Sequence, residues 1–446
     1  MIQLVRPSRN IHQSTPYYSA DGFEESGTWR ALKSLKVVRV LPDGYTVDVE
    51  IVTGDIQRSA LLSIAVLTDN ALSADSIEYV AAETGLLRVF FRNPIKSSSL
   101  PATIRALQAQ DPDFILLDLS DWESVAPLVD KLNERDLRAI IIGFRPKWDR
   151  MEALILKDAG IKYLLREPFS PAEMESVVYE ALHKEHPITN PNIIAFLPAK
   201  AGGGCSTTAI HTAAALTNTS PSNVLLIESD RRSGVYSIML GLDNQLGLDD
   251  ALSLGNAMTR MEWARHVVRI SGFHLLAANP GHRRSVPSWA DYYKLLCYVQ
   301  NQYDYVLIDL PEVVNEATAE VVRSARNIFI VCTPEIPSLK MAQLRATELE
   351  ACDIPSDRTH VLINRWERNG PDAEVFQNIL GRPVFATLPN DYASLRKAML
   401  ESRLASPESS FAEACQSLAR KVSGLPESER GLFKFMLLRR LARIAG

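Results

Sequence analysis

The sequence predicts an α/β protein built from two doubly wound parallel-sheet domains. Three observations support this fold class. A glycine-rich turn at 202–204 lies between an apolar run at 193–197 and a helix start rich in small residues. Two later apolar runs end in acidic residues, which is typical of strands that carry a ligand site at their carboxyl ends. Upstream, residues 61–182 alternate strand and helix patterns, as a second such sheet requires.

Composition sets bounds on the kind of protein. The 446 residues are enough for two or three domains, and 46% apolar with 23% charged residues is ordinary for a globular chain. A net charge of −5 argues against a surface that coats nucleic acid. The five cysteines include no C-x-x-C pair, which predicts a reducing compartment and no zinc site. No apolar stretch approaches ~18 residues and no signal-peptide pattern opens the chain, so we expect a cytoplasmic protein.

The glycine-rich turn has the pattern of a phosphate-binding loop that lacks its usual lysine. Residues 198–208 have the sequence PAKAGGGCSTT. Backbone N–H groups of such a turn and the start of the next helix point at one spot and bind anions. The standard motif ends in Gly-Lys-Ser/Thr, and here a cysteine stands at the lysine position. A plain strand–helix turn is the alternative; the nucleotide interpretation assigns phosphate contacts to Gly202, Gly203, Gly204, Cys205, Ser206 and Thr207.

Acidic residues follow two of the predicted strands. The run Val224–Ile227 is followed by Glu228 and Asp230, and the run Tyr305–Ile308 by Asp309. In an open parallel sheet these strand ends meet at one edge, where acids face phosphates and metal. Taken singly, each acid is better explained as a solvated strand end. All three, in order after the glycine loop, favour a nucleotide site.

These segments resemble the ParA/MinD group of deviant phosphate-loop ATPases, and the resemblance covers roughly residues 190–405. The run IFIVCTPEIPSL at 328–339 is similar to a strand of that group with its exit turn, and Leu-Pro-Asn-Asp at 388–391 to its late Pro-x-Asp turn. The resemblance implies that Asn364 and Arg365, at the end of a further apolar run, contact the adenine of a bound ATP.

The resemblance also implies roles for the loop and the acids. Lys200 matches the signature lysine, which reaches the nucleotide of a partner subunit, so a homodimer is implied. Ser206 and Asp309 match the residues that hold Mg²⁺, and Asp230 or Glu228 matches the acid that positions the attacking water. ATP then joins two subunits and hydrolysis separates them. Because the loop lysine is missing, we expect hydrolysis to be slow or absent.

Within the group, the chain is most similar to the CpaE/TadZ branch, which assists assembly of Flp/type IV pili. That branch also tends to lose the loop lysine, and it carries a receiver-like domain ahead of the ATPase domain. The resemblance implies a factor that marks a cell pole and recruits pilus secretion components, in the cytoplasm or at the inner membrane. Two alternatives stay open: a ParA-type partition ATPase acting over DNA, and a receiver-type phosphorelay regulator. The acidic balance and the sparse basic pair Arg396 and Lys397 do not favour nucleic acid as a partner.

The upstream domain, residues 61–182, resembles a response-regulator receiver whose chemistry has been lost. Asp118, at the end of an apolar run, matches the phosphoacceptor aspartate. The acidic pair that would bind Mg²⁺ is reduced to Asp69, and the hydroxyl position falls near Gly143. The Lys-Pro pair of receivers is Glu-Pro at 167–168, a charge reversal that repels phosphate. We therefore predict a pseudo-receiver used for docking or dimerisation, with Asp118 as a degenerate phosphoacceptor position.

Residues 1–60 predict an N-terminal extension with a β-hairpin. Its strands at 36–41 and 45–52 flank a Pro-Asp-Gly turn, and the second strand has one apolar face. Between the two domains, residues 183–192 contain two prolines and predict a short linker. The ATPase-like domain then spans 193–425.

Residues 426–446 predict a C-terminal amphipathic helix. Apolar residues share one face of it, and Arg439 and Arg443 point away from that face. A basic amphipathic end resembles the membrane-binding tail of MinD-type proteins and would contact an anionic lipid surface. Leu432 and Phe435 fall off the apolar stripe, so docking on the domain or on a partner is the other interpretation.

Overall fold

The structure is a computed structural model. It describes strands at 35–40 and 46–51 and, beyond them, residues 62–95, 100–134, 138–219, 222–243, 246–278, 287–367 and 373–425. The helix predicted at 426–446 lies outside the described residues, and so does the turn of the predicted hairpin. Within the described ranges, no helix has the length and apolar content needed to cross a membrane.

The two N-terminal strands, β1 (Leu35–Val40) and β2 (Thr46–Ile51), pair with each other and belong to a compact unit of their own. They are antiparallel, with Leu35 opposite Ile51 and Val40 opposite Thr46. The two strands overlap the segments predicted as strands at 36–41 and 45–52, and the hairpin of an N-terminal extension stays a prediction.

The first parallel sheet has five strands in the order β4-β3-β5-β6-β7. This is the flavodoxin-like order of doubly wound sheets, and it confirms the strand–helix alternation predicted for residues 61–182. The strands are β3 (Leu62–Leu67), β4 (Leu87–Asn93), β5 (Phe114–Asp118), β6 (Ile140–Arg145) and β7 (Tyr163–Arg166). The helices are α1 (Ala71–Thr84), α2 (Leu100–Gln110), α3 (Trp122–Asn133), α4 (Arg150–Asp158) and α5 (Pro171–Glu185).

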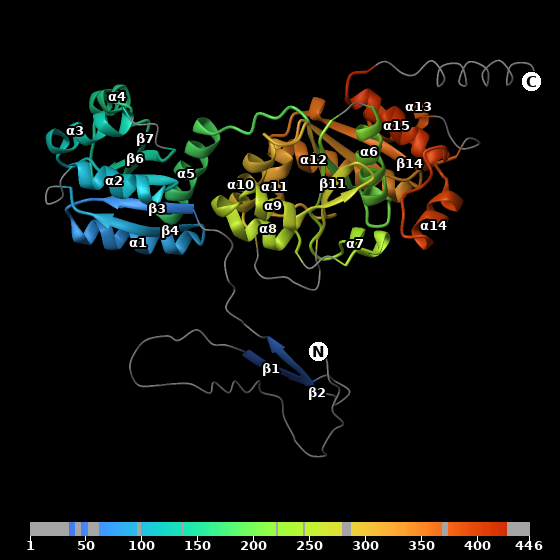
Figure 1. Ribbon diagram of the computed structural model, residues 1–446, viewed down its shortest axis with the longest axis horizontal. Helices are drawn as coiled ribbons and strands as arrows, with labels where there is room; N and C mark the ends of the chain where they lie inside the picture. The colour runs from blue at the N-terminus through green and yellow to red at the C-terminus, as the bar shows by residue number, and fades with distance from the viewer. Residues whose placement is uncertain are drawn as a thin grey trace, which may run out of the picture. The chain divides into compact units, whose positions relative to one another are not determined.

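Helices cover both faces of this sheet (Figure 1). Alternate residues of β3 serve the two sides: Ile64 packs with α1 and α5, whereas Ala65 packs with α2, α3 and α4. Every residue of β5 is buried, which is why its sequence is a continuous apolar run. Capping residues set the helix ends. The Asn70 side chain accepts the N–H of Leu72 at the start of α1, and Ser170 forms a capping box with Glu173 at the start of α5.

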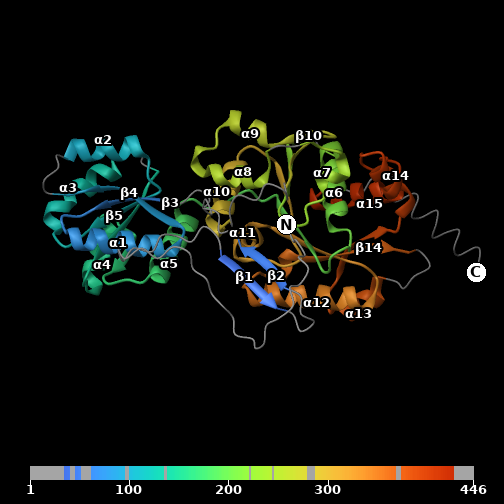
Figure 2. The same ribbon diagram turned by 90° about the horizontal axis from the view of Figure 1, so that it is seen from below.

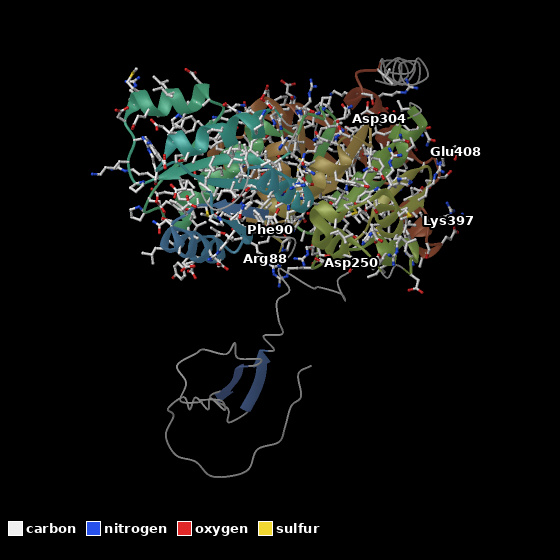
Figure 3. All side chains as sticks on the ribbon, turned by 60° about the vertical axis from the view of Figure 1, so that its left-hand side comes forward. Arg88, Phe90, Asp250, Asp304, Lys397 and Glu408 are labelled. Atoms are coloured by element: carbon white, nitrogen blue, oxygen red, sulfur yellow. The ribbon has the colours of Figure 1, made fainter. Side chains whose placement is uncertain are left out.

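The second sheet has eight strands in the order β10-β11-β9-β12-β8-β13-β14-β15, parallel except for the β10–β11 pair. The strand that leads to the glycine loop, β8, lies between β12 and β13. Before β12, the Asp304 carboxylate (labelled in Figure 3) accepts the backbone N–H of Asn223 at 2.8 Å and fixes β12 beside β9. The strands are β8 (Ile193–Pro198), β9 (Val224–Glu228), β10 (Val268–Ile270), β11 (Phe273–Leu276), β12 (Tyr305–Asp309), β13 (Asn327–Cys332), β14 (Thr359–Trp366) and β15 (Val384–Pro389).

Two layers of helices enclose the second sheet. Figure 2 shows α6 and α15 on one face and α12 and α13 on the other. The first layer comprises α6 (Cys205–Thr219), α7 (Tyr236–Leu240) and α15 (Ser410–Val422). The opposite layer comprises α8 (Leu248–Leu254), α9 (Arg260–His266), α10 (Trp289–Val299), α11 (Glu316–Ser324), α12 (Ile336–Ala351) and α13 (Ala373–Leu380). The remaining helix, α14 (Tyr392–Leu400), follows β15, and short 3-10 turns lie at Gly255–Ala257 and Ser356–Arg358.

The two parallel sheets are joined through α10. Its residues Trp289 and Tyr293 pack in the core of the five-stranded sheet, whereas Tyr292 packs in the core of the eight-stranded sheet. The Trp289 ring N–H donates to Glu175 at 2.9 Å, and the Tyr293 hydroxyl donates to the Leu182 carbonyl at 3.0 Å. The described residues of both sheets therefore belong to one compact unit. Helix α5 runs to Glu185, so it includes the first three residues of the segment predicted as a linker.

Buried charges reinforce this junction. Lys294 of α10 lies 3.4 Å from Asp113, and both side chains are less than a tenth exposed. Burial raises the pKa of Asp113, but the Lys294 charge and hydrogen bonds from Ser63 and Asn256 outweigh it, and the pKa falls below its ordinary value. On α5, the His183 ring lies 2.9 Å from the Glu320 carboxylate of α11.

The variant Lys294→Met removes the cation that faces buried Asp113. We expect the free energy of unfolding, measured by urea denaturation at pH 7, to fall by about 3 kcal/mol. The double variant Asp113→Asn/Lys294→Met removes both charges and should recover part of this loss. If the loss in the double variant equals the sum of the losses in Lys294→Met and in Asp113→Asn, the pairing is contradicted.

Candidate nucleotide-binding site

The glycine loop connects the central strand β8 to α6. Gly202 and Gly204 adopt left-handed backbone conformations with φ of 79° and 83°, which glycine tolerates without a steric penalty. Between them, the Gly203 N–H donates to the Lys200 carbonyl at 3.2 Å. The Thr208 N–H and hydroxyl both donate to the Gly204 carbonyl at 2.9 Å and close the first turn of α6. The loop thus turns sharply into a helix N-terminus, the backbone arrangement of an anion site.

Asn364 and Arg365, at the end of β14, lie directly against this loop. The Asn364 amide donates to the Gly203 carbonyl at 2.9 Å, and the Arg365 guanidinium donates to the Gly202 carbonyl at 2.8 Å. A Cβ at Gly204 would lie 2.2 Å from the Asn364 amide nitrogen, so a side chain at that position would displace Asn364. Both residues support the loop from β14, and their contact with adenine stays a prediction.

A cavity of about 750 Å³ opens beside Arg365. It lies where β13, β14 and β15 end, and three aromatic side chains line it together with charged and amide groups. Its volume and mixed lining suit a flat heteroaromatic ring with polar edges. The sequence analysis pointed to Arg365 and to the turn at 388–391 but missed the aromatic residues, which follow no spacing motif. The lining residues are Pro334, Glu335, Arg365, Trp366, Glu367, Phe376, Asn390 and Tyr392.

Asp309, at the end of β12, is a buried acid of the site, with 2% of its surface exposed. Its carboxylate accepts a hydrogen bond from the Tyr236 hydroxyl at 3.0 Å, and further ones from the Ser206 and Cys205 side chains. Burial raises the pKa of Asp309 to about 6 despite these hydrogen bonds, and the charge of Asp230 adds to the increase. The carboxylate is buried, and none of these three donors carries a positive charge that would compensate its negative charge.

Cys205 stands where the standard motif has its lysine. The side chain is buried, and burial, followed by the charge of Asp309, raises the pKa of its thiol well above the ordinary value. The thiol therefore stays protonated at neutral pH and donates a hydrogen bond to Asp309. In place of a cation directed at phosphate, this chain has a neutral donor directed at the acid of β12.

The acid that ends β9 and the acid two residues after it have different surroundings. Glu228 is 1% exposed, and its carboxylate accepts backbone N–H groups of Val235, Tyr236 and Ala278. Burial raises the pKa of Glu228 to about 7, in part offset by these hydrogen bonds. Asp230 accepts the backbone N–H groups of the residues two and three positions ahead, at 3.0 and 2.9 Å, which closes a tight turn. Both carboxylates accept backbone N–H groups, but Glu228 is buried and Asp230 is partly exposed. Which of the two orients water stays a prediction.

Charged side chains surround the mouth of the loop. Lys200 is exposed, and together with Arg365 it contributes to lowering the pKa of Glu335, for which a hydrogen bond from Thr333 is the largest cause. The Glu312 carboxylate accepts the backbone N–H of Ala201 at 2.9 Å. Glu312 and Tyr236 are site residues that the sequence analysis missed, because neither belongs to a motif.

Asp118 lies in the other sheet, at the end of β5. Its carboxylate accepts the Thr68 hydroxyl at 2.6 Å and the backbone N–H of Ser120 at 2.9 Å. Burial and then the Asp118 charge raise the pKa of nearby Glu167. A Cβ at Gly143 would lie 2.3 Å from a Leu119 methyl group, so leucine occupies the space that a hydroxyl side chain would need.

In the described part of the chain, no three or more His, Cys, Asp or Glu residues are grouped to hold a metal ion.

Comparison with known proteins gives relatives for about half of the chain. No family model matches the sequence. A ParA family protein of Chlamydia muridarum is 26% identical over 242 residues, which cover 45% of this chain and 94% of that protein. The septum site-determining protein MinD of Synechocystis is 24% identical over 250 residues, or 52% of this chain and 89% of that protein.

Solved structures of similar proteins include a ParA family ATPase from Chlorobium tepidum, with a TM-score of 0.48 and 20% identity over 51% of this chain and 97% of that one. MinD of Pyrococcus horikoshii, solved with Mg-ADP, has a TM-score of 0.42 and 22% identity over 52% of this chain and 95% of that one. On the sequence relatives and on the geometry of its glycine loop, this chain is, over about half of its length, similar to the P-loop ATPases of the ParA and MinD families.

Proposed function

We propose that this chain binds ATP with Mg²⁺ as a homodimer and acts as a localisation and assembly factor, with weak or absent hydrolysis. The observation that carries the proposal is the glycine loop with its two left-handed glycines, set between the buried acid Asp309 and the loop-supporting pair Asn364 and Arg365. This arrangement is suited to holding a nucleotide. Because Cys205 is neutral, the chain would hydrolyse the bound nucleotide slowly.

The residues present fit a magnesium–nucleotide complex. Mg²⁺ prefers oxygen ligands, usually a carboxylate or hydroxyl together with phosphate oxygens and water. The Ser206 hydroxyl and the Asp309 carboxylate supply such oxygens in hydrogen-bonding distance of one another. A bound cation would offset the charge of Asp309, because the hydrogen-bond donors described above for this carboxylate are all uncharged. The cavity beside Arg365 has room for the adenine.

Weak hydrolysis follows from the charges around the loop. Phosphoryl transfer depends mainly on cations fixed near the outer phosphates, and Cys205 supplies none. Lys200 is exposed beside the loop, as a residue that reaches a second subunit must be. The nucleotide would then serve to join two copies of the chain rather than to drive rapid turnover.

The localisation role is that of a CpaE/TadZ-like factor, which marks a cell pole and recruits the secretion machinery of Flp/type IV pili at the inner membrane. Two features support it: the glycine loop lacks its lysine, and a five-stranded sheet of flavodoxin-like order precedes it. We propose that this sheet is a pseudo-receiver that serves as a docking module. Leu119 beside Gly143 and the acid Glu167 near Asp118 both oppose phosphorylation.

A ParA-type partition ATPase acting over DNA is the second candidate, because ParA family proteins are among the relatives. Its basic surface would include Arg396 and Lys397, which are exposed on α14 (Lys397 is labelled in Figure 3). A titration of duplex DNA at two salt concentrations separates the two functions. Strong binding that weakens with salt would favour partition over assembly.

Binding of a fluorescent ATP analogue tests the site. Asp309→Ala should weaken affinity at least tenfold in Mg²⁺ and little in EDTA, because its carboxylate acts through the metal. Lys200→Ala should reduce dimer formation, followed by light scattering. Asp304→Ala, at the opposite end of β12, is the matched control and should bind as the wild type does. Equal affinity in Mg²⁺ for the wild type and Asp309→Ala would show that nucleotide binds elsewhere.

The raised pKa of Glu228 predicts how stability depends on pH. A carboxyl group with a pKa of about 7 in the folded chain and 4.5 as its ordinary value stabilises the fold below pH 4.5 and loses this contribution as pH rises toward 7. The free energy of unfolding without nucleotide should therefore fall between about pH 4.5 and pH 7. The slope contributed by one such group is at most about 1.4 kcal/mol per pH unit. Glu228→Gln should flatten the curve from urea denaturation; an unchanged slope would contradict the assignment.

Asp118 should remain unmodified when the protein is incubated with acetyl phosphate and Mg²⁺. Glu167 repels an incoming phosphoryl group, and Leu119 fills the space of the missing hydroxyl. Intact-protein mass spectrometry measures the outcome. A mass increase of one phosphoryl group that is lost in Asp118→Asn would instead support a phosphorelay regulator.

A further inference from the structure

Tyr236 is a buried side chain at the centre of the site. It begins α7, eight residues after Glu228, and none of its surface is exposed. Its hydroxyl oxygen lies 3.0 Å from the Ser206 carbonyl oxygen and 3.0 Å from Asp309 Oδ2. A phenol has one proton, so it donates to one of these oxygens at a time and is shared between them.

Tyr236 and Cys205 converge on the same carboxylate. The Cys205 thiol and the Tyr236 hydroxyl both donate hydrogen bonds to Asp309. A cysteine side chain has one heavy atom beyond Cβ, whereas a lysine has four. Because protein interiors leave few voids, a ring from α7 and a lysine from residue 205 would compete for the space in front of Asp309.

We propose that Tyr236 is a positioning residue that closes the metal position of the site until nucleotide binds, in the space left by the short side chain at 205. The proposal rests on the proposed function, in which Ser206 and Asp309 hold the metal. The backbone N–H of Tyr236 donates to Glu228 at 2.9 Å, so the residue that carries the ring is anchored to the end of β9. Release of Asp309 by the phenol is thereby linked to the position of Glu228.

The test measures how much Mg²⁺ improves binding of a fluorescent ATP analogue, as the ratio of Kd in EDTA to Kd in Mg²⁺. Tyr236→Phe removes only the hydroxyl, so Asp309 no longer has to give up this hydrogen bond. The ratio should rise about tenfold above that of the wild type, with Kd in EDTA unchanged. Tyr292→Phe is the matched control: its hydroxyl is also buried and hydrogen-bonds Ser229 at 2.6 Å, and its ratio should equal that of the wild type.

An unchanged or smaller ratio in Tyr236→Phe would overturn the proposal while leaving nucleotide binding in place. If neither the wild type nor Tyr236→Phe binds the analogue in either buffer, the proposed function and this inference both fall. The two failures are therefore distinguishable.

A second measurement needs no nucleotide. If the ring and a lysine exclude one another, Cys205→Lys should lower the melting temperature strongly in the wild type and much less in the Tyr236→Leu background. The same change in the Tyr292→Leu background should cost as much as in the wild type. Additive effects of Cys205→Lys and Tyr236→Leu would show that the two side chains do not share this space.

Discussion

The site depends on one constraint: the carboxylate at the end of β12 is buried away from water, and the groups that donate hydrogen bonds to it are uncharged. Asp309 accepts a thiol and two hydroxyl groups, and it lies in register with Glu228 on the neighbouring strand. Two buried acids side by side repel one another, which contributes to the raised pKa of Glu228. Other features of the site are placed around this pair, because the loop, the turn after β9 and α7 all direct donors toward it.

A second constraint keeps the two sheets together. The α10 helix is apolar on both sides, and each side belongs to a different core. Buried Lys294 and Asp113 then fix how α10 meets the start of β5, since each would be costly to bury alone. Glu320 of α11, which contacts His183 of α5, follows the β12 strand that ends in Asp309. The five-stranded sheet is thus packed against the helix that leads away from the site.

Much of this architecture could be predicted from the sequence, and the omissions have physical causes. Strands such as β3 and β8 are buried on both faces, so their apolar runs mark them to within a residue. The glycine loop and Asp309 follow from spacing along single strands. Tyr236 could not be predicted, because its role comes from contacts with β12 and α6 that no local pattern encodes. The prolines of the segment at 183–192 predict a linker, yet its first three residues belong to α5, where His183 contacts Tyr293 of α10 and Glu320 of α11.

The double-faced α10 has a consequence for how the chain could have been assembled. A module that can be exchanged between proteins presents a polar surface at its boundary, but here Trp289 and Tyr293 would face water if the five-stranded sheet were absent. The half that carries the glycine loop would therefore lose apolar burial, and with it stability, if it were separated from the five-stranded sheet. A substitution in α10 that disturbs one core is therefore expected to weaken the packing of the other core as well.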